Sequence, residues 1–225
     1  MRSKTTAPVS GRAKKAVVLL SGGLDSAVAL HLALEKGYAC LPLVFDYGQR
    51  HRREVESAKK LAGAAGLTCV VERLKFPWKG SSLLDGKKVI PENRAPGIPG
   101  TYVPARNTVF MAIALSYAEA VGAKAVFIGA HTGDYSGYPD CRPAFFRAFR
   151  DVRDKGTKSG RGIKIMTPLI NMNKSEIVKT GARLGVPFGL TWSCYKGGAR
   201  PCGKCDSCYY RAGGFRDAGL EDPAL

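Results

Sequence analysis

The sequence contains no apolar run close to the ~20 residues that a membrane-spanning helix needs. Its first 15 residues are basic and lack the apolar stretch of a secretion signal. Acidic residues are also scarce, because 18 Asp and Glu stand against 35 Lys and Arg and leave a net charge of +17. We therefore expect a cytoplasmic protein, with no membrane contact, whose partner is anionic, such as nucleotide phosphates or RNA.

Disulfide bonds are not expected either, although the chain has 7 cysteines, because the cytosol keeps thiols reduced. Four of them, Cys194, Cys202, Cys205 and Cys208, form a Cys-x7-Cys-x2-Cys-x2-Cys pattern with Gly203 at a turn position. These short spacings predict a metal site. Four thiolates complete a tetrahedron without water, which favours structural zinc, whereas an iron–sulfur cluster uses the same ligands and remains an alternative.

Strand-like and helix-like segments alternate along the chain, which is 45% hydrophobic. The expected strands are 16–20, 39–45, 67–72, 125–130 and 163–166, and the expected helices are 27–36, 51–65, 107–121, 143–153 and 173–184. Asn171 or Asn173 is the candidate N-cap of the last helix. This alternation predicts a doubly wound, Rossmann-like α/β fold with a parallel sheet, whose ligands gather at the carboxyl ends of the strands.

Three stretches fall outside this alternation. Residues 1–14 have almost nothing to bury and are expected to form a flexible basic tail. Residues 76–101 lose all periodicity, which is typical of a functional loop or an insertion. We therefore expect one α/β domain over 15–190, followed by a small metal-binding segment over 191–225.

The loop after the first strand reads Ser-Gly-Gly-Leu-Asp-Ser at 21–26. Glycines between a strand and a helix let backbone N–H groups approach phosphate, and the helix N-terminus adds a favourable dipole. The string lacks both the Walker and the Rossmann glycine patterns. A carboxylate beside phosphates, here Asp25, favours nucleotide that carries Mg²⁺. The same string could also be a strand-to-helix turn in which Asp25 or Ser26 caps the helix.

The loop resembles the pyrophosphate loop of the ATP-pyrophosphatase superfamily, whose members cleave ATP between the α and β phosphates. Three further strings at 45–51, 101–107 and 134–142, together with the Cys-rich tail, are similar to the 7-cyano-7-deazaguanine synthase family over 15–215. The resemblance implies an enzyme that uses ATP, ammonia and 7-carboxy-7-deazaguanine to make the nitrile precursor of queuosine or archaeosine. It also implies a homodimer.

On this resemblance each motif receives expected roles. The nucleotide-binding residues are Leu20, Ser21, Gly22, Gly23, Leu24, Asp25, Ser26, Ala27, Asp46 and Lys174. The substrate-binding residues are Tyr47, Gln49, Arg50, Arg106, Asn107, Tyr135, Ser136, Tyr138 and Asp140. The catalytic residues are Asp25, Ser26, Arg106 and Lys174, in which the positive groups stabilise charge that moves onto the phosphates.

Plainer interpretations of these residues stay open. Arg50 and Lys174 could be solvated charges, Asn107 could be a helix N-cap, and the tyrosines at 135 and 138 could anchor a loop. His131 follows the fourth strand, where proton transfer is conceivable, but it receives no role. Two other functions also remain: a tRNA-thiolating or tRNA-adenylating enzyme on the same scaffold, and a non-catalytic basic zinc protein. We find no separate RNA-binding module, so direct nucleic-acid binding is not expected.

Overall fold

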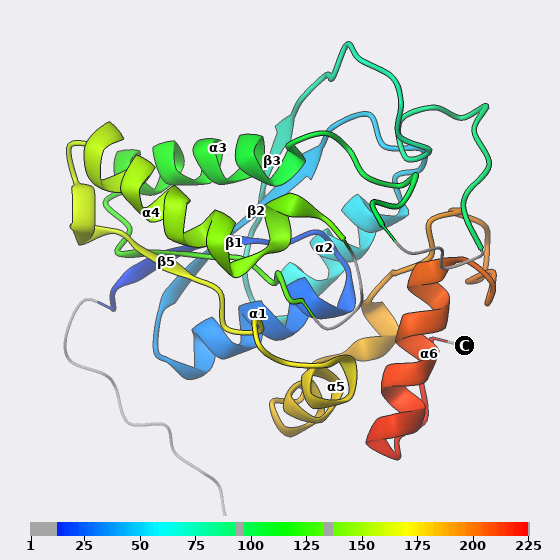
Figure 1. The fold of residues 1–225 in the computed structure, drawn as a ribbon. Coiled ribbons are helices and arrows are strands. Elements are labelled where there is room, and N and C mark those ends of the chain that lie inside the picture. The colour runs from blue at the N-terminus through cyan, green and yellow to red at the C-terminus, as the bar shows by residue number, and fades with distance from the viewer. Residues whose placement is uncertain (1–12, 93–96, 133–136, 225) are drawn as a thin grey trace, which may run out of the picture.

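A computed structural model describes residues 13–92, 97–132 and 137–224 (Figure 1). Its centre is one five-stranded sheet with the strand order β3-β2-β1-β4-β5, and all neighbouring strands are parallel. The strands are β1 (Lys15–Leu19), β2 (Ala39–Asp46), β3 (Val70–Arg73), β4 (Ala125–Phe127) and β5 (Lys164–Met166). The innermost strand, β1, is the continuous apolar run that a strand covered on both faces requires.

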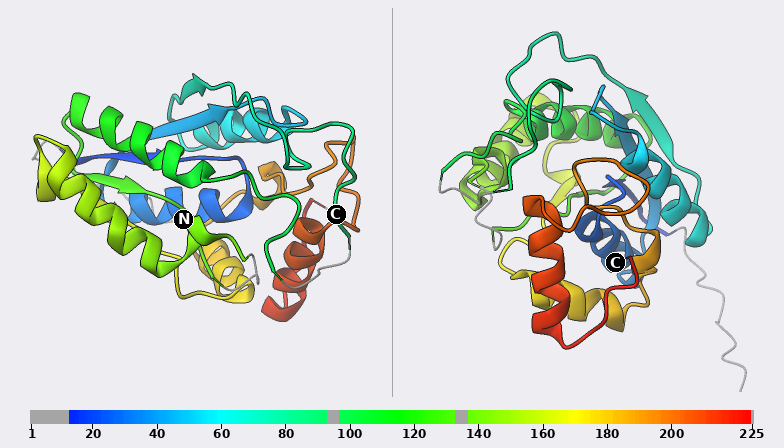
Figure 2. Two further views of the ribbon diagram at one scale, coloured as in Figure 1. Left: turned by 45° about the horizontal axis from the view of Figure 1, so that its top comes forward. Right: turned by 90° about the vertical axis from the view of Figure 1, so that its right-hand side faces the viewer.

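Helices cover both faces of the sheet (Figures 1 and 2). One layer contains α1 (Leu24–Glu35), α2 (Arg53–Ala64) and α5 (Lys174–Arg183), and the other contains α3 (Arg106–Ala120) and α4 (Pro143–Gly156). Short 3-10 helices lie at Pro139–Cys141, Gly160–Gly162 and Phe188–Leu190. Alternate residues of β1 enter the two cores: Val18 packs with the first layer and Val17 with the second. The predicted doubly wound α/β fold is confirmed.

The strand order reverses at β1, which pairs with β2 on one side and with β4 on the other. In open α/β sheets such a reversal leaves a crevice at the carboxyl ends of the two diverging strands. The loop after β1 and the residues after β4 therefore meet at one point. The topology places the predicted phosphate loop at the position where this class of fold binds its ligands.

The first helix begins earlier than predicted. It starts at Leu24 rather than at residue 27, so Asp25 and Ser26 lie in its first turn. Its N-cap, Gly23, has no side chain to cap the helix, and the acidic Asp25 instead meets the positive end of the helix dipole. The glycine pair obscured this boundary, because glycine is normally a poor helix residue.

The C-terminal segment carries a helix, α6 (Asp206–Ala218), that the sequence did not predict. This helix lies beside α5 at the end of the sheet where the strands terminate (Figure 1). The buried Arg211 ties it down by donating to Thr191 Oγ1 at 2.6 Å and by pairing with Asp222 at 2.6 Å. The backbone N–H of Trp192 also donates to the Gly22 carbonyl at 2.9 Å. Residues 191–224 thus pack directly against the phosphate loop.

The segment between β3 and α3 has neither helix nor strand in its described residues, in agreement with the prediction. It nevertheless buries Ser81, Leu83 and Ile90, and Ser81 Oγ donates to the Thr101 carbonyl at 3.0 Å. The segment is therefore packed onto the body of the protein. No helix of the described residues has the length and hydrophobicity that crossing a membrane requires.

Candidate active site

The loop after β1 is held open by its own hydrogen bonds. Ser26 Oγ accepts the Ser21 N–H at 3.2 Å and donates to the Gly23 carbonyl at 2.9 Å. Gly22 adopts a φ of +88°, and a Cβ at this position would lie 2.1 Å from the Glu54 carbonyl oxygen. Only glycine fits there, because α2 packs directly on the loop. The loop shape is thus fixed before any ligand binds.

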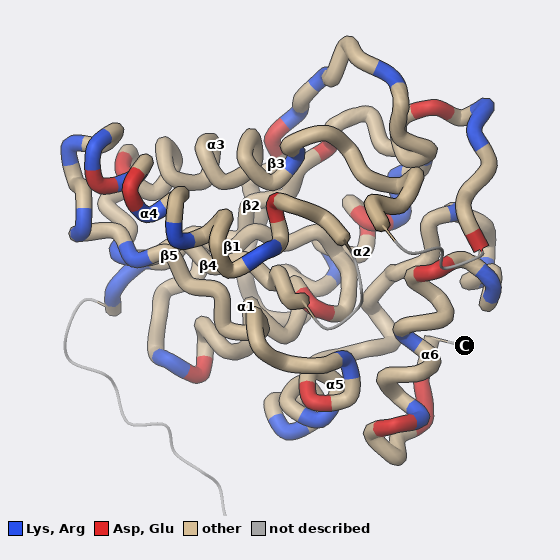
Figure 3. Tube along the Cα trace, viewed as in Figure 1, with Lys and Arg blue, Asp and Glu red and all other residues tan. Residues whose placement is uncertain are grey.

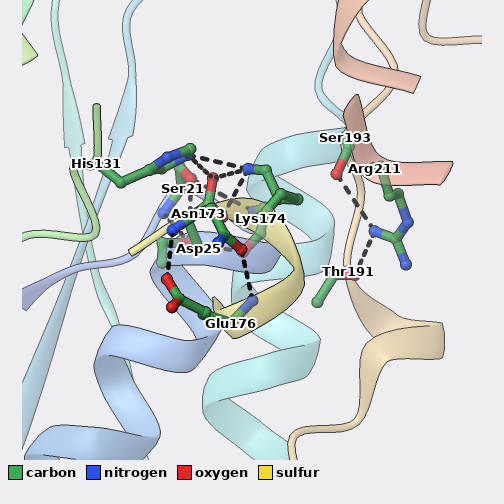
Figure 4. A network of polar contacts seen from close by, with 11 residues as sticks. Ser21, Asp25, His131, Asn173, Lys174, Glu176, Thr191, Ser193 and Arg211 are labelled. Carbon is green, nitrogen blue, oxygen red and sulfur yellow. Dashed lines mark hydrogen bonds and ion pairs between the residues drawn. The ribbon is translucent and has the colours of Figure 1, made fainter. Parts of the chain in front are cut away.

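Asp25, Lys174 and His131 form a polar cluster at the mouth of this loop (Figure 4). Lys174 Nζ lies 2.9 Å and 3.0 Å from the two oxygens of Asp25, and 3.0 Å from His131 Nε2. Burial raises the pKa of the Asp25 carboxyl, but the Lys174 ammonium and His131 outweigh this effect and hold the pKa well below its ordinary value of 3.8. Asp25 is therefore ionised at neutral pH and forms an ion pair with Lys174.

Local structure places the Lys174 side chain. Asn173 is the N-cap of α5 and accepts from the Glu176 N–H at 3.0 Å, while Glu176 returns a bond to the Asn173 N–H at 2.8 Å. This capping box fixes the first turn that carries Lys174. A Cβ on Gly214 of α6 would lie 2.2 Å from Lys174 Cγ, so α6 closes against the lysine stem. The resulting position points the ammonium at the loop.

A cavity of about 580 Å³ opens beside the cluster, a volume typical of small-molecule sites. Its walls come from the loop, the first turns of α2 and α3, the segment before α3 and the C-terminal segment. Apolar and aromatic side chains, among them Leu43, Phe45 and Phe110, line its interior. Such a cavity can hold a small molecule beside the phosphate loop.

Arg106 projects into this cavity from the start of α3. Ala105, with a φ of 50°, turns the chain into the helix, and its N–H donates to Tyr102 Oη at 2.9 Å. The Arg106 guanidinium donates to Tyr47 Oη at 2.9 Å and lies 5.9 Å from the centroid of the Phe110 ring. A cation held between aromatic rings is well placed to bind an anionic group.

Glu54 is a cavity residue that sequence reasoning missed. It lies in the first turn of α2, where burial raises the pKa of its carboxyl to about 7 although Arg106 opposes the shift. In the sequence Glu54 lies within the expected helix over 51–65, and no motif singles it out. The signal that would have found Glu54 is its closeness in sequence to the motif at 45–51. His131, which received no role, also lines the cavity.

Most of the predicted site residues converge on this cavity. Those that line it are Leu20, Ser21, Gly23, Leu24, Asp25, Ser26, Tyr47, Arg106, Asn107, Tyr138 and Lys174. Gly22 and Ala27 belong to the same loop and helix but do not line the cavity. Tyr135 and Ser136 lie outside the described residues. The sequence motifs therefore meet in space, although their roles in binding stay predictions.

Four further predicted residues are not among those that line the cavity, and their predicted roles stay predictions. Asp140 Oδ2 is buried and accepts the Asn107 N–H at 2.9 Å, so it caps the start of α3. Asp46 pairs with Arg52 at 3.4 Å in a separate surface depression. Gln49 bonds to the backbone N–H of Tyr47 at 2.9 Å, and the Arg50 guanidinium donates to the Lys88 carbonyl at 2.8 Å.

The four clustered cysteines meet next to the cavity. Their sulfur atoms all lie within 4.8 Å of one another, and Cys202 Sγ is 3.9 Å from Cys208 Sγ. The backbone N–H groups of Lys196 and Cys202 donate to Cys194 Sγ at 3.4 Å and 3.3 Å, which stabilises negative charge on this sulfur. Sulfurs at ~2.3 Å from one zinc ion stand just under 4 Å apart, so the donor set fits tetrahedral zinc.

A parallel sheet with a Ser-Gly-Gly-x-Asp-Ser loop at its switch point defines an α/β protein of the pyrophosphate-loop class. The family model of the queuosine biosynthesis protein QueC matches residues 15–219. The chain therefore belongs to the QueC family.

Named relatives agree with this assignment. The chain is 51% identical to the 7-cyano-7-deazaguanine synthase of Azotobacter vinelandii, over 93% of this chain and 97% of that protein. It is 50% identical to the 7-cyano-7-deazaguanine synthase of Alcanivorax borkumensis, over 93% and 98%. Among solved structures, a 4-thiouridine synthetase in complex with RNA and ATP is 23% identical, with a TM-score of 0.47 over 77% of this chain and 41% of that one.

Proposed function

We propose that this protein is an ATP-dependent ligase that converts 7-carboxy-7-deazaguanine and ammonia to 7-cyano-7-deazaguanine. The observation that carries the proposal is the family match over 15–219, together with relatives of that name at about half identity over nearly their whole length. The cavity beside the Asp25–Lys174 cluster offers a site for both substrates of this reaction.

The chemistry requires two adenylations. A carboxylate is a poor electrophile, so its oxygen first takes AMP from ATP and pyrophosphate leaves. Ammonia then displaces AMP to give the amide. The amide oxygen takes a second AMP, whose departure leaves the nitrile. One phosphate loop beside one substrate cavity serves both adenylations, because the reacting carbon stays in place.

We assign the phosphate-side work to three groups. The N–H groups of the loop at 21–26 and the N-terminus of α1 bind the phosphates. Lys174 supplies positive charge where the bond between the α and β phosphates breaks, and Asp25 holds it there through the contact at 2.9 Å. Arg106 binds the carboxylate of the substrate from the opposite wall.

Two metals belong to this proposal. Zinc bound by Cys194, Cys202, Cys205 and Cys208 would have a structural role, because four thiolates complete its coordination and leave no position for a reacting molecule. It would hold the segment that carries α6 against the cavity wall. Magnesium would arrive with ATP, where Asp25 offers the carboxylate oxygens that it prefers. In this structure Lys174 contacts both of those oxygens.

We further propose that the protein is a cytoplasmic homodimer. The described cysteines form no disulfide, which suits a reducing compartment, and the family resemblance supports the dimer. Light scattering on the purified protein measures the mass directly. A single species at 24.1 kDa would contradict the dimer.

The test of the proposed function is mass spectrometry of the purified protein with ATP, Mg²⁺, ammonium and 7-carboxy-7-deazaguanine. We expect the nitrile, AMP and pyrophosphate, with two AMP per nitrile. An unchanged carboxylate in folded, zinc-loaded protein would refute the proposal, and unmodified tRNA would then be the next substrate to test.

A further inference from the structure

The cavity wall includes a carboxyl group that the phosphate chemistry does not use. Among the described residues that line the cavity, three are acidic: Asp25, Glu54 and Asp206. Asp25 is engaged by Lys174 at 2.9 Å. Asp206 follows Cys205 of the metal cluster directly, in the first turn of α6. Glu54 belongs neither to the contact between Asp25 and Lys174 nor to the turn beside the metal cluster.

The backbone places Glu54 between the phosphate loop and the substrate wall. Its carbonyl oxygen would lie 2.1 Å from a Cβ on Gly22, so the first turn of α2 is pressed against the loop. Its carboxyl group interacts electrostatically with the Arg106 guanidinium of α3 and with the phenol groups of Tyr47 and Tyr195 from two other segments. Glu54 therefore borders the place where a carboxylate held by Arg106 would meet the α-phosphate.

We propose that Glu54 is the general base of nitrile formation, an inference that rests on the proposed function. When ammonia attacks the acyl adenylate, the C–N bond forms, the C–O bond to AMP breaks, and one N–H proton passes to Glu54. After the second adenylation, the C–O bond breaks again, both remaining N–H protons leave, and their electron pairs complete the C≡N bond. Glu54 takes these protons in turn and releases each one to water.

The environment of the carboxyl group suits this role. Burial raises the pKa of Glu54 to about 7, while the nearby Arg106 limits the rise. A base with a pKa close to the working pH both accepts and releases protons readily. The pKa of Asp25 is held far lower by Lys174, which makes that carboxylate a weak base. Asp25 is thus suited to stay negatively charged, whereas Glu54 is suited to accept and release protons.

The deciding experiment separates adenylation from proton transfer in the zinc-loaded protein. Exchange of labelled pyrophosphate into ATP, with 7-carboxy-7-deazaguanine and without ammonia, reports the first adenylation alone. We expect Glu54→Gln to keep this exchange within about threefold and to lose nitrile formation by about 10²-fold or more. Glu54→Asp should restore part of the loss. Glu56→Gln, an exposed neighbour on α2, is the matched control and should match wild type in both assays.

The outcomes are distinguishable. Loss of exchange together with nitrile formation in Glu54→Gln, or normal nitrile formation in that variant, overturns the assignment of the base while the proposed function stands. Absence of exchange and of nitrile in the wild-type protein overturns the proposed function, and this inference with it.

A pH profile tests the same inference without any substitution. With the concentration of free ammonia held constant, kcat of the wild-type enzyme should fall about tenfold per pH unit below pH 7, because protonated Glu54 accepts no proton. A flat profile between pH 5.5 and 7 contradicts the proposal, and it does so even if Glu54→Gln fails to fold.

Discussion

Two pairs of oppositely charged residues near the phosphate loop have different effects on the pKa of their carboxyl groups. Asp25 and Lys174 neutralise each other at 2.9 Å, and His131 stands 3.0 Å from the same ammonium. The Glu54 carboxyl group interacts electrostatically with the Arg106 guanidinium and makes a second pair of opposite charges at the cavity. The two pairs differ in what they do to their carboxyl groups: the first lowers the pKa and the second leaves it raised.

At this scale we expect Lys174→Met to reduce ATP–pyrophosphate exchange by about 10²- to 10³-fold, because the charge that meets the phosphates is lost. The melting temperature should fall by a few degrees, since Asp25 loses its closest cation. Lys179→Met, an exposed lysine on the same helix, is the control. Undiminished exchange in Lys174→Met would show that this ammonium does not act on the phosphates.

Glu54 predicts a pH dependence of stability. Its pKa is raised from 4.5 to about 7 on folding, so between these values the native state binds the proton that the unfolded state has lost. Stability should therefore fall as pH rises from about 4.5 to about 7 and level off above. Because the carboxyl lines an open cavity, we expect this one group to contribute about 1–2 kcal/mol. Glu54→Gln should remove that part of the dependence, as urea unfolding at pH 5 and pH 8 would show; an identical dependence in the variant contradicts it.

The N-terminal boundaries of three helices position these residues at the site. The loop before α1 bends through Gly22, α3 begins at a left-handed Ala105, and α5 begins at a capping box. Each of these boundaries fixes the first turn of a helix, and each first turn bears a residue of the cavity. Local backbone geometry thus sets the positions of Asp25, Arg106 and Lys174.

The capping box gives a test at the scale of an element. Asn173→Ala should cost about 1 kcal/mol, because the Glu176 N–H loses its acceptor. In a chain of this size that corresponds to a melting temperature lower by about 2–4 °C. Activity should fall as well, since Lys174 is the next residue. The alternative cap considered from sequence, Asn171, supplies the control: Asn171→Ala should melt like wild type, and a reversed order of the two variants would contradict the assignment.

At the scale of the whole molecule, the C-terminal segment forms one side of the cavity. The C-terminal segment wraps back so that α6 lies beside α5 and Trp192 bonds to Gly22 (Figure 2). By contrast, Lys and Arg gather at the far end, around the last turns of α4 and the chain leading into β5 (Figure 3). The described residues that line the cavity balance their charges, with Arg106, Lys174 and Arg211 against Asp25, Glu54 and Asp206.

At this scale we expect zinc removal by a strong chelator, or Cys205→Ser, to lower the melting temperature and the activity together. The reason is that the cysteine cluster holds the segment that closes one wall of the cavity. Cys69→Ser, outside the cluster, is the control and should keep both properties. Lost activity with an unchanged melting curve would contradict a structural role of the metal.

The sequence by itself determined the class of fold, because alternating apolar strands and helices leave few ways to bury both faces of a sheet. It also identified the loop at 21–26 and the four cysteines, whose chemistry depends on short spacings along the chain. The sequence did not predict where α1 starts, because a glycine pair precedes the helix. It did not predict α6, which has no clear apolar stripe. These are features that packing decides.

Only the tertiary structure decided which side chains share the cavity. The sequence assigned Asp140 and Asp46 binding roles, and the fold adds contacts that no motif shows, of Asp140 with the start of α3 and of Asp46 with Arg52. No motif in the sequence singles out Glu54, yet the packing of α2 on Gly22 places it in the cavity wall. Burial and long-range contacts depend on residues far apart in the chain, and these set the environment that determines the pKa of a carboxyl group.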